Sequence, residues 1–322
     1  DLVRRNWHKE FGTPPDVLLN GSHRYADGKL HEEVQRIGGL LTHLDKQWNY
    51  AAGIHHPTPD RHLHGLSLVP PKSALWTTFD GKRFQPTPLV TGTDTRFLVS
   101  EICKQSQKYS WMILNWKIAK KELAVSGAEF NEAIRDKKLI TFLRNILLGN
   151  PKLVKKLAAE CKDIVVANSV EELALKMNGI TNQTDIDPVK LEAEIKNFDQ
   201  ILENRKKDDS DFQLQVLKKA RSYRGERARV SKFQKILDKG AFPLIAIRTF
   251  ILTRKSLGGI KTDLESRVLN DTGQPIHGLY AVGEAAGFGG GGIHGLRALE
   301  GTFLGSCILT GQAAARSIKG KK

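Results

Sequence analysis

The feature that most constrains this chain is a glycine-rich stretch near its C-terminal end, residues 278–305. Within it, the short apolar run 279–282 lies between Gly278 and Gly283, and its length and β-prone residues predict a buried strand. The loop that follows is so rich in glycine that its backbone can take positive φ angles and approach another molecule where any Cβ would clash. This arrangement indicates a cofactor site.

A long helix is predicted after the loop, over about residues 302–318. Its apolar residues are not confined to one stripe, so we expect it to be buried on most sides. The amide N–H groups of its first turn have no intrahelical partner, and the helix dipole adds about half a positive charge there. Such a helix end favours an electron-rich group.

A competing interpretation is a dinucleotide-binding βαβ unit, because Gly287, Gly289 and Gly292 fit G-x-G-x-x-G after a strand. That fingerprint needs a helix that begins within the glycines and a second strand ending in an acidic residue about 20 residues later. Here the helix begins later and no second strand follows it. The context therefore disfavours this interpretation.

Several ordered motifs carry a resemblance to a known group of enzymes. They are G-G-I-K-T-D at 258–263, R-V-L-N at 267–270, G-Q-P-I-H-G-L-Y-A-V-G-E at 273–284 and the glycine loop. Together they resemble the C-terminal part of the FAD-dependent dehydrogenases of the fumarate reductase, succinate dehydrogenase and 3-ketosteroid dehydrogenase superfamily. The resemblance is strong over residues 258–322 and looser over 27–84.

The resemblance implies an α/β (α+β) fold, made of the C-terminal portion of a Rossmann-like FAD-binding domain and a largely helical cap domain. Residues 1–54 and 251–322 would belong to the FAD-binding domain, and 55–250 to the substrate-capping domain. The chain opens at Asp1 without a starting methionine and without the first βαβ unit of the family. We therefore expect an inactive fragment whose N-terminal βαβ unit is missing, and which does not hold FAD tightly by itself.

FAD is the cofactor that the resemblance implies. Glu284 would accept hydrogen bonds from ribityl or ribose hydroxyls, although a carboxylate capping the glycine loop is an alternative. The amides at the start of the last helix would face the N1/C2 carbonyl edge of the flavin. The expected cofactor-binding residues are Gly283, Glu284, Gly295, Gly301, Thr302, Phe303 and Leu304.

Three residues are candidates for substrate chemistry. His56, before Pro57, matches a histidine that contacts the substrate carboxylate in the resembling enzymes, and Arg96 stands near the place of their proton-donating arginine. Arg297 lies one residue before the position of their substrate arginine, so dicarboxylate specificity is in doubt. A structural role for Arg96 is equally open, and His55, His62 and His64 are interpreted as ordinary loop histidines.

The remaining pattern predicts the cap. We expect helix over 27–53 and through most of 98–239, a capping box at 169–172, a helix from Asp187-Pro188 towards residue 203, a hairpin turn at Asp80-Gly81, and a strand over 241–248. Arg83 is expected to be structural by the resemblance, and Trp111, Met112 and Trp116 to belong to the core.

Composition limits the alternatives. The net charge is +15, and a cluster of lysines and arginines lies between residues 218 and 235. Such a cluster can attract nucleic acid, anionic lipid or an acidic substrate, but a solvated helix face is the simpler interpretation. The three cysteines show no metal-ligand spacing, so no metal site is expected. With no apolar segment long enough to span a membrane, the expected location is the cytoplasm.

Two functions remain in view. The first is an FAD-dependent oxidoreductase that acts by hydride transfer at flavin N5 on a carbon–carbon bond adjacent to a carbonyl or carboxylate. The alternative is a basic interaction module, binding nucleic acid or protein, with a structural glycine-rich loop. The expected partner is a small-molecule substrate, with a second copy or the missing N-terminal half as further candidates; nucleic acid is disfavoured.

Overall fold

The computed structural model describes residues 2–84, 95–288 and 302–320. The chain divides into two compact units: unit 1 contains residues 1–14, 22–49 and 253–322, and unit 2 contains residues 15–21 and 50–252. The division falls after residues 49 and 252, whereas the sequence suggested boundaries after 54 and 250. That one unit is a flavin domain and the other a cap stays a prediction.

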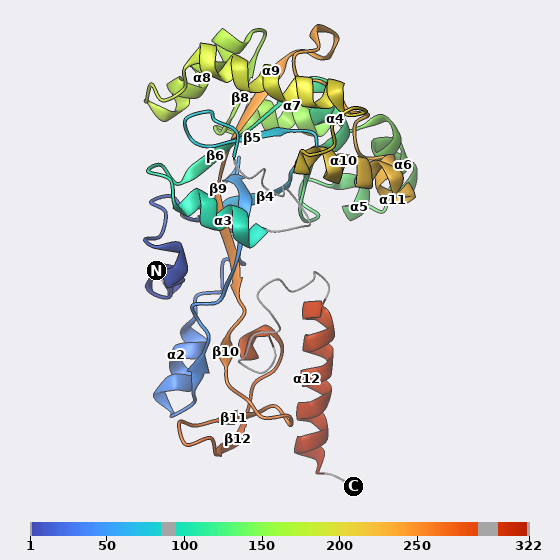
Figure 1. Cartoon of the computed structure of the whole chain (residues 1–322). Helices are drawn as coiled ribbons and strands as arrows, with labels where there is room; N and C mark the ends of the chain where they lie inside the picture. Colours follow the sequence, from blue (N-terminus) through green and yellow to red (C-terminus); the bar gives the residue numbers. More distant parts are fainter. Residues whose placement is uncertain (1, 85–94, 289–301, 321–322) are drawn as a thin grey trace. The chain divides into compact units, whose positions relative to one another are not determined.

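Unit 2 is built on a sheet that, among the described residues, has eight strands in the order β5-β6-β9-β3-β4-β7, with β1 and β8 also paired to β9 (Figure 1). Their bounds are β1 Leu19–Asn20, β3 Gln47–His55, β4 Gly65–Val69, β5 Leu75–Thr77, β6 Tyr109–Asn115, β7 Ala124–Val125, β8 Ile164–Ala167 and β9 Leu244–Ser256.

Strand β9 is the centre of this sheet. It pairs antiparallel with β6 from Tyr109 opposite Phe250 to Asn115 opposite Leu244. It also pairs antiparallel with β8, over the shorter stretch 244–247. Its first residues are buried on both faces, which explains their nearly continuous apolar sequence. The strand predicted over 241–248 is therefore confirmed from Leu244 onwards, and it continues to Ser256, whereas residues 239–241 form a 3₁₀ turn.

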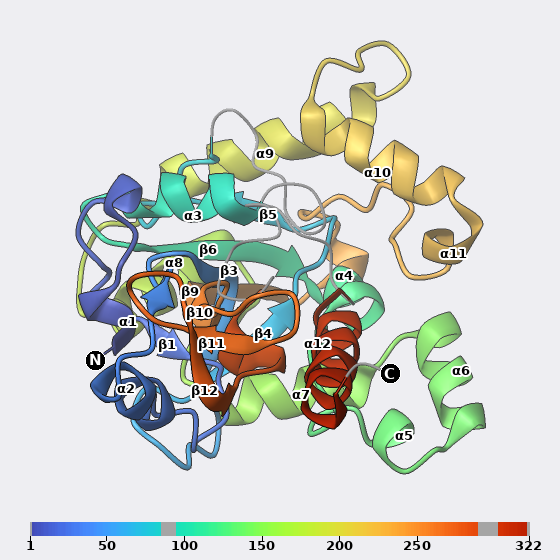
Figure 2. The ribbon, with the colours of Figure 1, turned by 90° about the horizontal axis from the view of Figure 1, so that it is seen from below.

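Helices surround the sheet of unit 2 (Figure 1). They are α3 Thr95–Cys103, α4 Trp116–Glu122, α5 Glu132–Arg135, α6 Leu139–Leu148, α7 Pro151–Glu160, α8 Val170–Thr181, α9 Pro188–Asn204, α10 Phe212–Ser222 and α11 Arg224–Arg227, with the 3₁₀ turn η2 Lys239–Ala241. In Figure 2, as in Figure 1, α5 and α6 lie at the periphery of the unit.

Local capping signals are confirmed. The Ser169 hydroxyl accepts from the Glu172 N–H at 3.1 Å and begins α8. The Asp187 carboxylate accepts from the two N–H groups that follow Pro188 and begins α9. The hairpin at Asp80-Gly81 is also present, with Gly81 at φ +86° and the Thr78 N–H donating to the Lys82 carbonyl.

Arg83 is structural, as expected. Its guanidinium donates to both carboxylate oxygens of Asp211, at 2.8 and 3.2 Å, and to Gln213 Oε1 at 3.1 Å. It also lies 4.9 Å from the centre of the Phe198 ring. These contacts join the hairpin to α9 and to the start of α10, so they fix three segments of unit 2 with one buried side chain.

Two helical predictions are wrong in part. Residues 98–239 contain β6, β7 and β8 as well as helices. The run 109–115 is apolar because β6 is buried on both sides inside the sheet, and its Trp111 and Met112 are core residues. Within 27–53 the helix α2 covers only Lys29–Arg36, and β2 Leu41–Thr42 and β3 follow it. Gly38, at φ +92°, ends the helix there.

Unit 1 contains short strands and one long helix. The strands are β2, β10 Gly259–Ile260, β11 Arg267–Leu269 and β12 Pro275–Tyr280; the helical elements are α1 Leu2–Arg5, α2, η1 Lys9–Phe11, η3 Gly283–Ala286 and α12 Thr302–Lys319. β2 pairs with β10, and β11 with β12. Val34, Ile260, Val268, Ala281 and Ala286 form its small core.

Two burial predictions for unit 1 are wrong. The strand expected over 279–282 is β12, which ends at Tyr280 and is mostly exposed, so that only Ala281 of the apolar run is buried. Helix α12 has the expected length, but only Ala314 is buried, and Leu304, Ile308 and Leu309 are more than half exposed. The helix has apolar residues on all of its sides, but only the side with Ala314 packs against the described part of the chain.

Candidate active site

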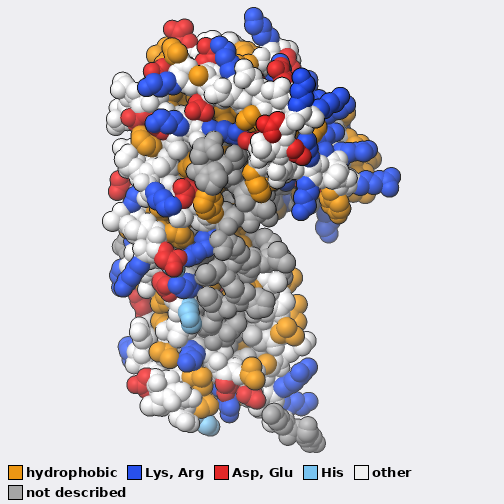
Figure 3. Space-filling model, in the orientation of Figure 1, with side chains coloured by type: hydrophobic (Ala, Val, Ile, Leu, Met, Phe, Trp, Pro, Cys, Tyr) orange, Lys and Arg blue, Asp and Glu red, His pale blue; other side chains and the backbone are white. Residues whose placement is uncertain are grey.

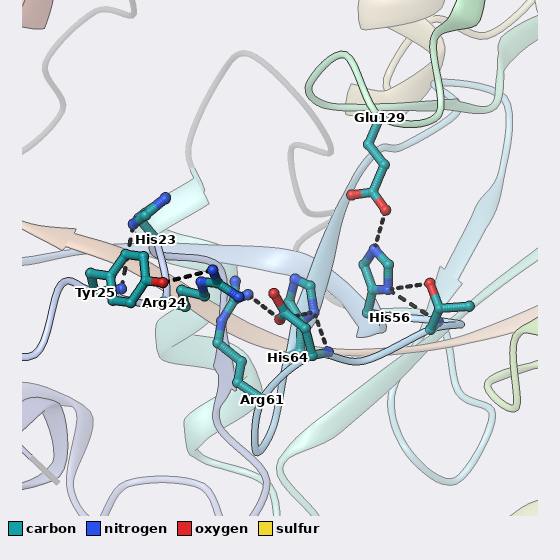
Figure 4. Close-up of polar contacts among 9 residues, drawn as sticks. His23, Arg24, Tyr25, His56, Arg61, His64 and Glu129 are labelled. Carbon is teal, nitrogen blue, oxygen red and sulfur yellow. Dashed lines mark hydrogen bonds and ion pairs between the residues drawn. The ribbon is translucent and has the colours of Figure 1, made fainter.

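His56 lies immediately after β3 and is buried. Its Nδ1 accepts a hydrogen bond from the Thr58 N–H at 3.1 Å, so in the neutral ring the proton is on Nε2. Nε2 lies 3.0 Å from Glu129 Oε1 (Figure 4), although the N–H is not aligned for a hydrogen bond with that oxygen. The imidazole therefore presents a buried donor beside an exposed carboxylate.

A second histidine stacks on His56. The rings of His56 and His64 are 4.1 Å apart and nearly parallel, and Asp60 Oδ1 lies 3.0 Å from His64 Nδ1 (Figure 4). Burial lowers the pKa of His64, and the neighbouring His56 and Arg61 lower it further, against the opposing effect of Asp60. The stack thus favours a neutral His64. His64 interacts with Asp60 of its own loop, and we propose no chemical role for it.

A buried ion cluster lies next to this site and was missed by the sequence analysis. The Asp163 side chain is fully buried; its Oδ2 accepts from the His55 N–H at 2.7 Å and from the His55 ring at 2.8 Å, and its Oδ1 accepts from Arg248 Nη2 at 3.3 Å. Burial alone would raise the pKa of Asp163, but these hydrogen bonds and charges lower it overall. The cluster ties β3 and β9 to the start of β8.

Arg96 lies in the first turn of α3 and is half-buried. It belongs to unit 2, as His56 does, but to a different element. Its predicted partner Asp94 lies outside the described residues, as do Arg297, Gly295 and Gly301. The roles of these residues remain predictions.

In unit 1, the glycine loop begins at Gly283, whose φ is +60°. Its N–H donates to Thr310 Oγ1 of α12 at 3.0 Å, and a Cβ at this position would lie 3.1 Å from Cys307 Sγ. A larger residue would therefore push the loop away from the helix. Gly283 packs the loop against α12.

Another glycine of the loop serves internal packing. A Cβ on Gly287 would lie 2.4 Å from the carbonyl carbon of Gly258, and a Cβ on Gly259 would lie 2.5 Å from the Gly287 amide nitrogen. The pair Gly258-Gly259 and Gly287 are thus in backbone-to-backbone contact. The close approach that the sequence predicted toward another molecule is, at Gly287, an approach within the chain.

The side chain of Lys255 contacts two of the predicted cofactor residues, Glu284 and Phe303. Lys255 Nζ donates to Glu284 Oε1 at 2.6 Å and lies 3.9 Å from the centre of the Phe303 ring. The Phe303 ring, in the first turn of α12, stacks on Phe288 at 4.5 Å and meets the edge of Trp48 at 5.4 Å. The Glu284 side chain is 60% exposed, so its carboxylate remains accessible.

This cluster combines a cation, a carboxylate and a flat apolar surface at the beginning of a long helix. A carboxylate accepts hydrogen bonds from hydroxyl groups, and a helix N-terminus and a lysine both favour negative charge. The aromatic rings offer a planar surface for stacking. No group of three or more His, Cys, Asp or Glu side chains that could hold a metal ion was found among the described residues.

Comparison with known proteins assigns the chain to a family. The profile of a family described as FAD binding domain matches residues 3–304, so the chain belongs to this family. The KsdD-like steroid dehydrogenase of Mycobacterium tuberculosis is 42% identical over 318 residues, which cover 98% of this chain and 56% of that protein. The chain therefore spans about half the length of the curated relatives it matches.

Solved structures show the same fold. The 3-ketosteroid delta1-dehydrogenase from Sterolibacterium denitrificans, in complex with 1,4-androstadiene-3,17-dione, has a TM-score of 0.61 at 15% identity. The match covers 100% of this chain and 51% of the dehydrogenase. A flavocytochrome c3 fumarate reductase has a TM-score of 0.52 at 16% identity, and the match covers 92% of this chain and 40% of the reductase. The superfamily suggested by the sequence motifs is confirmed by the family profile and by the KsdD-like relative, and the family profile supports FAD as the cofactor.

No described helix has both the length and the apolar character needed to cross a membrane.

Proposed function

We propose that the chain forms part of an FAD-dependent dehydrogenase that acts on a carbon–carbon bond next to a carbonyl group, with steroid-like ketones as its substrate class. The observation that carries the proposal is the 42% identity over 98% of the chain with a KsdD-like steroid dehydrogenase. Because the chain spans 56% of that relative, the activity of the whole protein is part of the proposal.

The cluster around Lys255 fits the flavin end of FAD. We assign Glu284 to the ribityl or ribose hydroxyls, since both of its oxygens can accept hydrogen bonds. The N–H groups of Thr302, Phe303 and Leu304, together with Lys255, would stabilise negative charge on the carbonyl edge of the ring. Gly283, Gly295 and Gly301 complete the proposed cofactor residues. Bound FAD would supply hydride transfer at its N5 atom.

His56 is proposed to bind the substrate oxygen. Its Nδ1 is held as an acceptor by the Thr58 N–H, so the buried Nε2–H is the group that can donate to a carbonyl. Such a bond polarises the carbonyl and acidifies the neighbouring C–H, which helps proton removal there. Arg96 and Arg297 remain the proposed groups for moving that proton, and an arginine needs a carboxylate partner for this role.

The test is a purified full gene product, examined first for bound flavin by its absorbance near the visible flavin bands. Under anaerobic conditions, a 3-ketosteroid should bleach this absorbance, whereas succinate should not. Bleaching by succinate alone would exclude the ketone assignment. A colourless preparation that binds nucleic acid in a salt-sensitive manner would favour the basic interaction module instead.

A further inference from the structure

Helix α6, Leu139–Leu148, exposes an apolar face. Seven of its ten residues are large and apolar, yet none of the ten is buried. The exposed fractions are 65% for Leu139, 85% for Ile140, 49% for Leu143, 64% for Leu147 and 67% for Leu148. Leu139, Ile140, Leu143 and Leu147 recur at three- and four-residue steps, and Leu148 follows Leu147 on the same exposed half of the helix.

The inward side of α6 is different. Thr141, Phe142, Asn145 and Ile146 are only partly exposed and line a cavity of about 620 Å³, which α4, α7 and the turn before α5 also border. The inward side thus faces other elements of unit 2. Ordinary solubility disfavours five neighbouring aliphatic side chains on the outward side, which indicates that something covers them.

The charge around α6 bears on what could cover it. Between residues 117 and 160 the chain has ten lysines and arginines and five acidic residues. Several of the basic side chains, namely Lys120, Lys121, Lys138, Arg144, Lys152 and Lys156, border the same cavity. Figure 3 shows hydrophobic and basic side chains next to each other along the edge of unit 2 that carries α6, α10 and α11.

We propose that α6 and its basic surroundings bind the surface of an anionic lipid bilayer. Aliphatic side chains would enter the boundary between headgroups and acyl chains, while lysine and arginine contact lipid phosphates. The helix is about 15 Å long, half of what a spanning helix needs, so it would lie along the surface.

Charge also argues against a second copy as the occupant of this face. A symmetric pair would bring the same excess of lysine and arginine against itself, which costs free energy through like-charge repulsion. An acidic protein would satisfy the cations, but five exposed aliphatic side chains on one short helix match a lipid boundary better than a charged protein surface. The lipid surface satisfies both features at once.

The experiment measures sedimentation of the 322-residue chain with vesicles. One set of vesicles is an equimolar mixture of phosphatidylglycerol and phosphatidylcholine, and the other is phosphatidylcholine alone. The test variant is Leu143→Gln with Leu147→Gln, which keeps the charge. The matched control is Leu175→Gln with Val189→Gln, two aliphatic residues of the same unit that are 62% and 77% exposed on α8 and α9.

We expect the parent chain and the control to bind the anionic vesicles equally, with weaker binding at high salt, and the α6 variant to bind at least about tenfold more weakly. Arg144→Gln should weaken binding to the anionic vesicles and leave binding to neutral ones unchanged. Because every substituted side chain is exposed, circular dichroism and the melting temperature should not change.

Three results would overturn the proposal. The first is equal vesicle binding by the parent and the α6 variant. The second is equal binding of the parent to neutral and anionic vesicles, since the basic side chains would then have no role. The third is a parent that sediments as a dimer without vesicles and an α6 variant that sediments as a monomer, which would mean that a second copy covers the face.

Discussion

Asp163 is predicted to be the side chain of unit 2 whose loss of charge costs the most stability. Asp163→Asn keeps the size but removes the negative charge that faces Arg248 and His55, and the new amide N–H₂ group cannot accept a hydrogen bond from either of them. Removing one partner of a buried ion pair costs about 3–5 kcal/mol. Arg248 is 16% exposed and keeps a bond to the Ile180 carbonyl, so we expect about 3 kcal/mol.

The assay is thermal unfolding followed by near-UV circular dichroism. For a unit of this size, about 3 kcal/mol corresponds to a lowering of Tm by roughly 6–12 °C. The control is Asp209→Asn, which removes a carboxylate that is 60% exposed and pairs with Lys218 at the surface, and should change stability by less than about 1 kcal/mol. Equal Tm values for the parent and Asp163→Asn would refute the reasoning.

The pH dependence gives the same prediction a second readout. The pKa of Asp163 is lower in the folded protein than its ordinary value of 3.8, because the bonds and charges of His55 and Arg248 outweigh burial. Its stabilising effect is therefore fully present above that value and is lost as the pH falls through the lower, folded value. The Tm difference between parent and variant should be constant at neutral pH and should shrink in the acid range below about pH 4.

Three further changes test other parts of the structure. Glu284→Gln in the full gene product should weaken FAD binding by about 1–3 kcal/mol, measured by equilibrium dialysis; an unchanged affinity would remove Glu284 from the cofactor site. Arg83→Lys should lower stability by about 2 kcal/mol in urea unfolding, because a lysine cannot form the paired bonds to Asp211. Gly287→Ala should prevent folding or cost well over 3 kcal/mol, since its Cβ meets backbone, whereas Gly273→Ala, at φ +79° in open space, should cost about 1–2 kcal/mol; similar melting temperatures would contradict the packing argument.

The sequence predicted local features well because their causes are local. A capping side chain needs a partner only two or three residues away, so Ser169 and Asp187 could be read from their neighbours alone. The hairpin at Gly81 depends on one positive φ angle. The strand β9 was predicted because its short apolar run is rich in isoleucine, and β-branched residues favour a buried strand over a helix.

Features that depend on distant segments were missed. Strand β6 has a continuous apolar sequence because both of its faces are covered, and such a run does not distinguish a buried strand from a buried helix. Asp163 lies 108 residues from His55, and nothing near it in the sequence indicates a buried pair. The apolar residues of α12 predicted burial, but composition cannot show which faces meet a partner.

The candidate cofactor site was predicted in part. The motif around Gly283 and Glu284 was long enough to identify the family, and the profile match bears this out. Lys255 was missed, although it joins Glu284 to Phe303, because the three residues come from three separate segments. A basic residue next to the Gly258-Gly259 pair was the only available signal, and on its own such a residue is ordinary.

The surroundings of His56 bear on the choice between a ketone and a dicarboxylate substrate. A histidine that binds a carboxylate as a cation needs both ring nitrogens to donate, but Nδ1 here accepts from the Thr58 N–H, and that bond would be lost. The Glu129 carboxylate already lies 3.0 Å from Nε2, so a substrate carboxylate at the same nitrogen would face like-charge repulsion. A neutral carbonyl oxygen avoids both costs, because it needs one donor and brings no charge. The local chemistry of this histidine therefore supports the proposed ketone class on grounds other than the identity with steroid dehydrogenases.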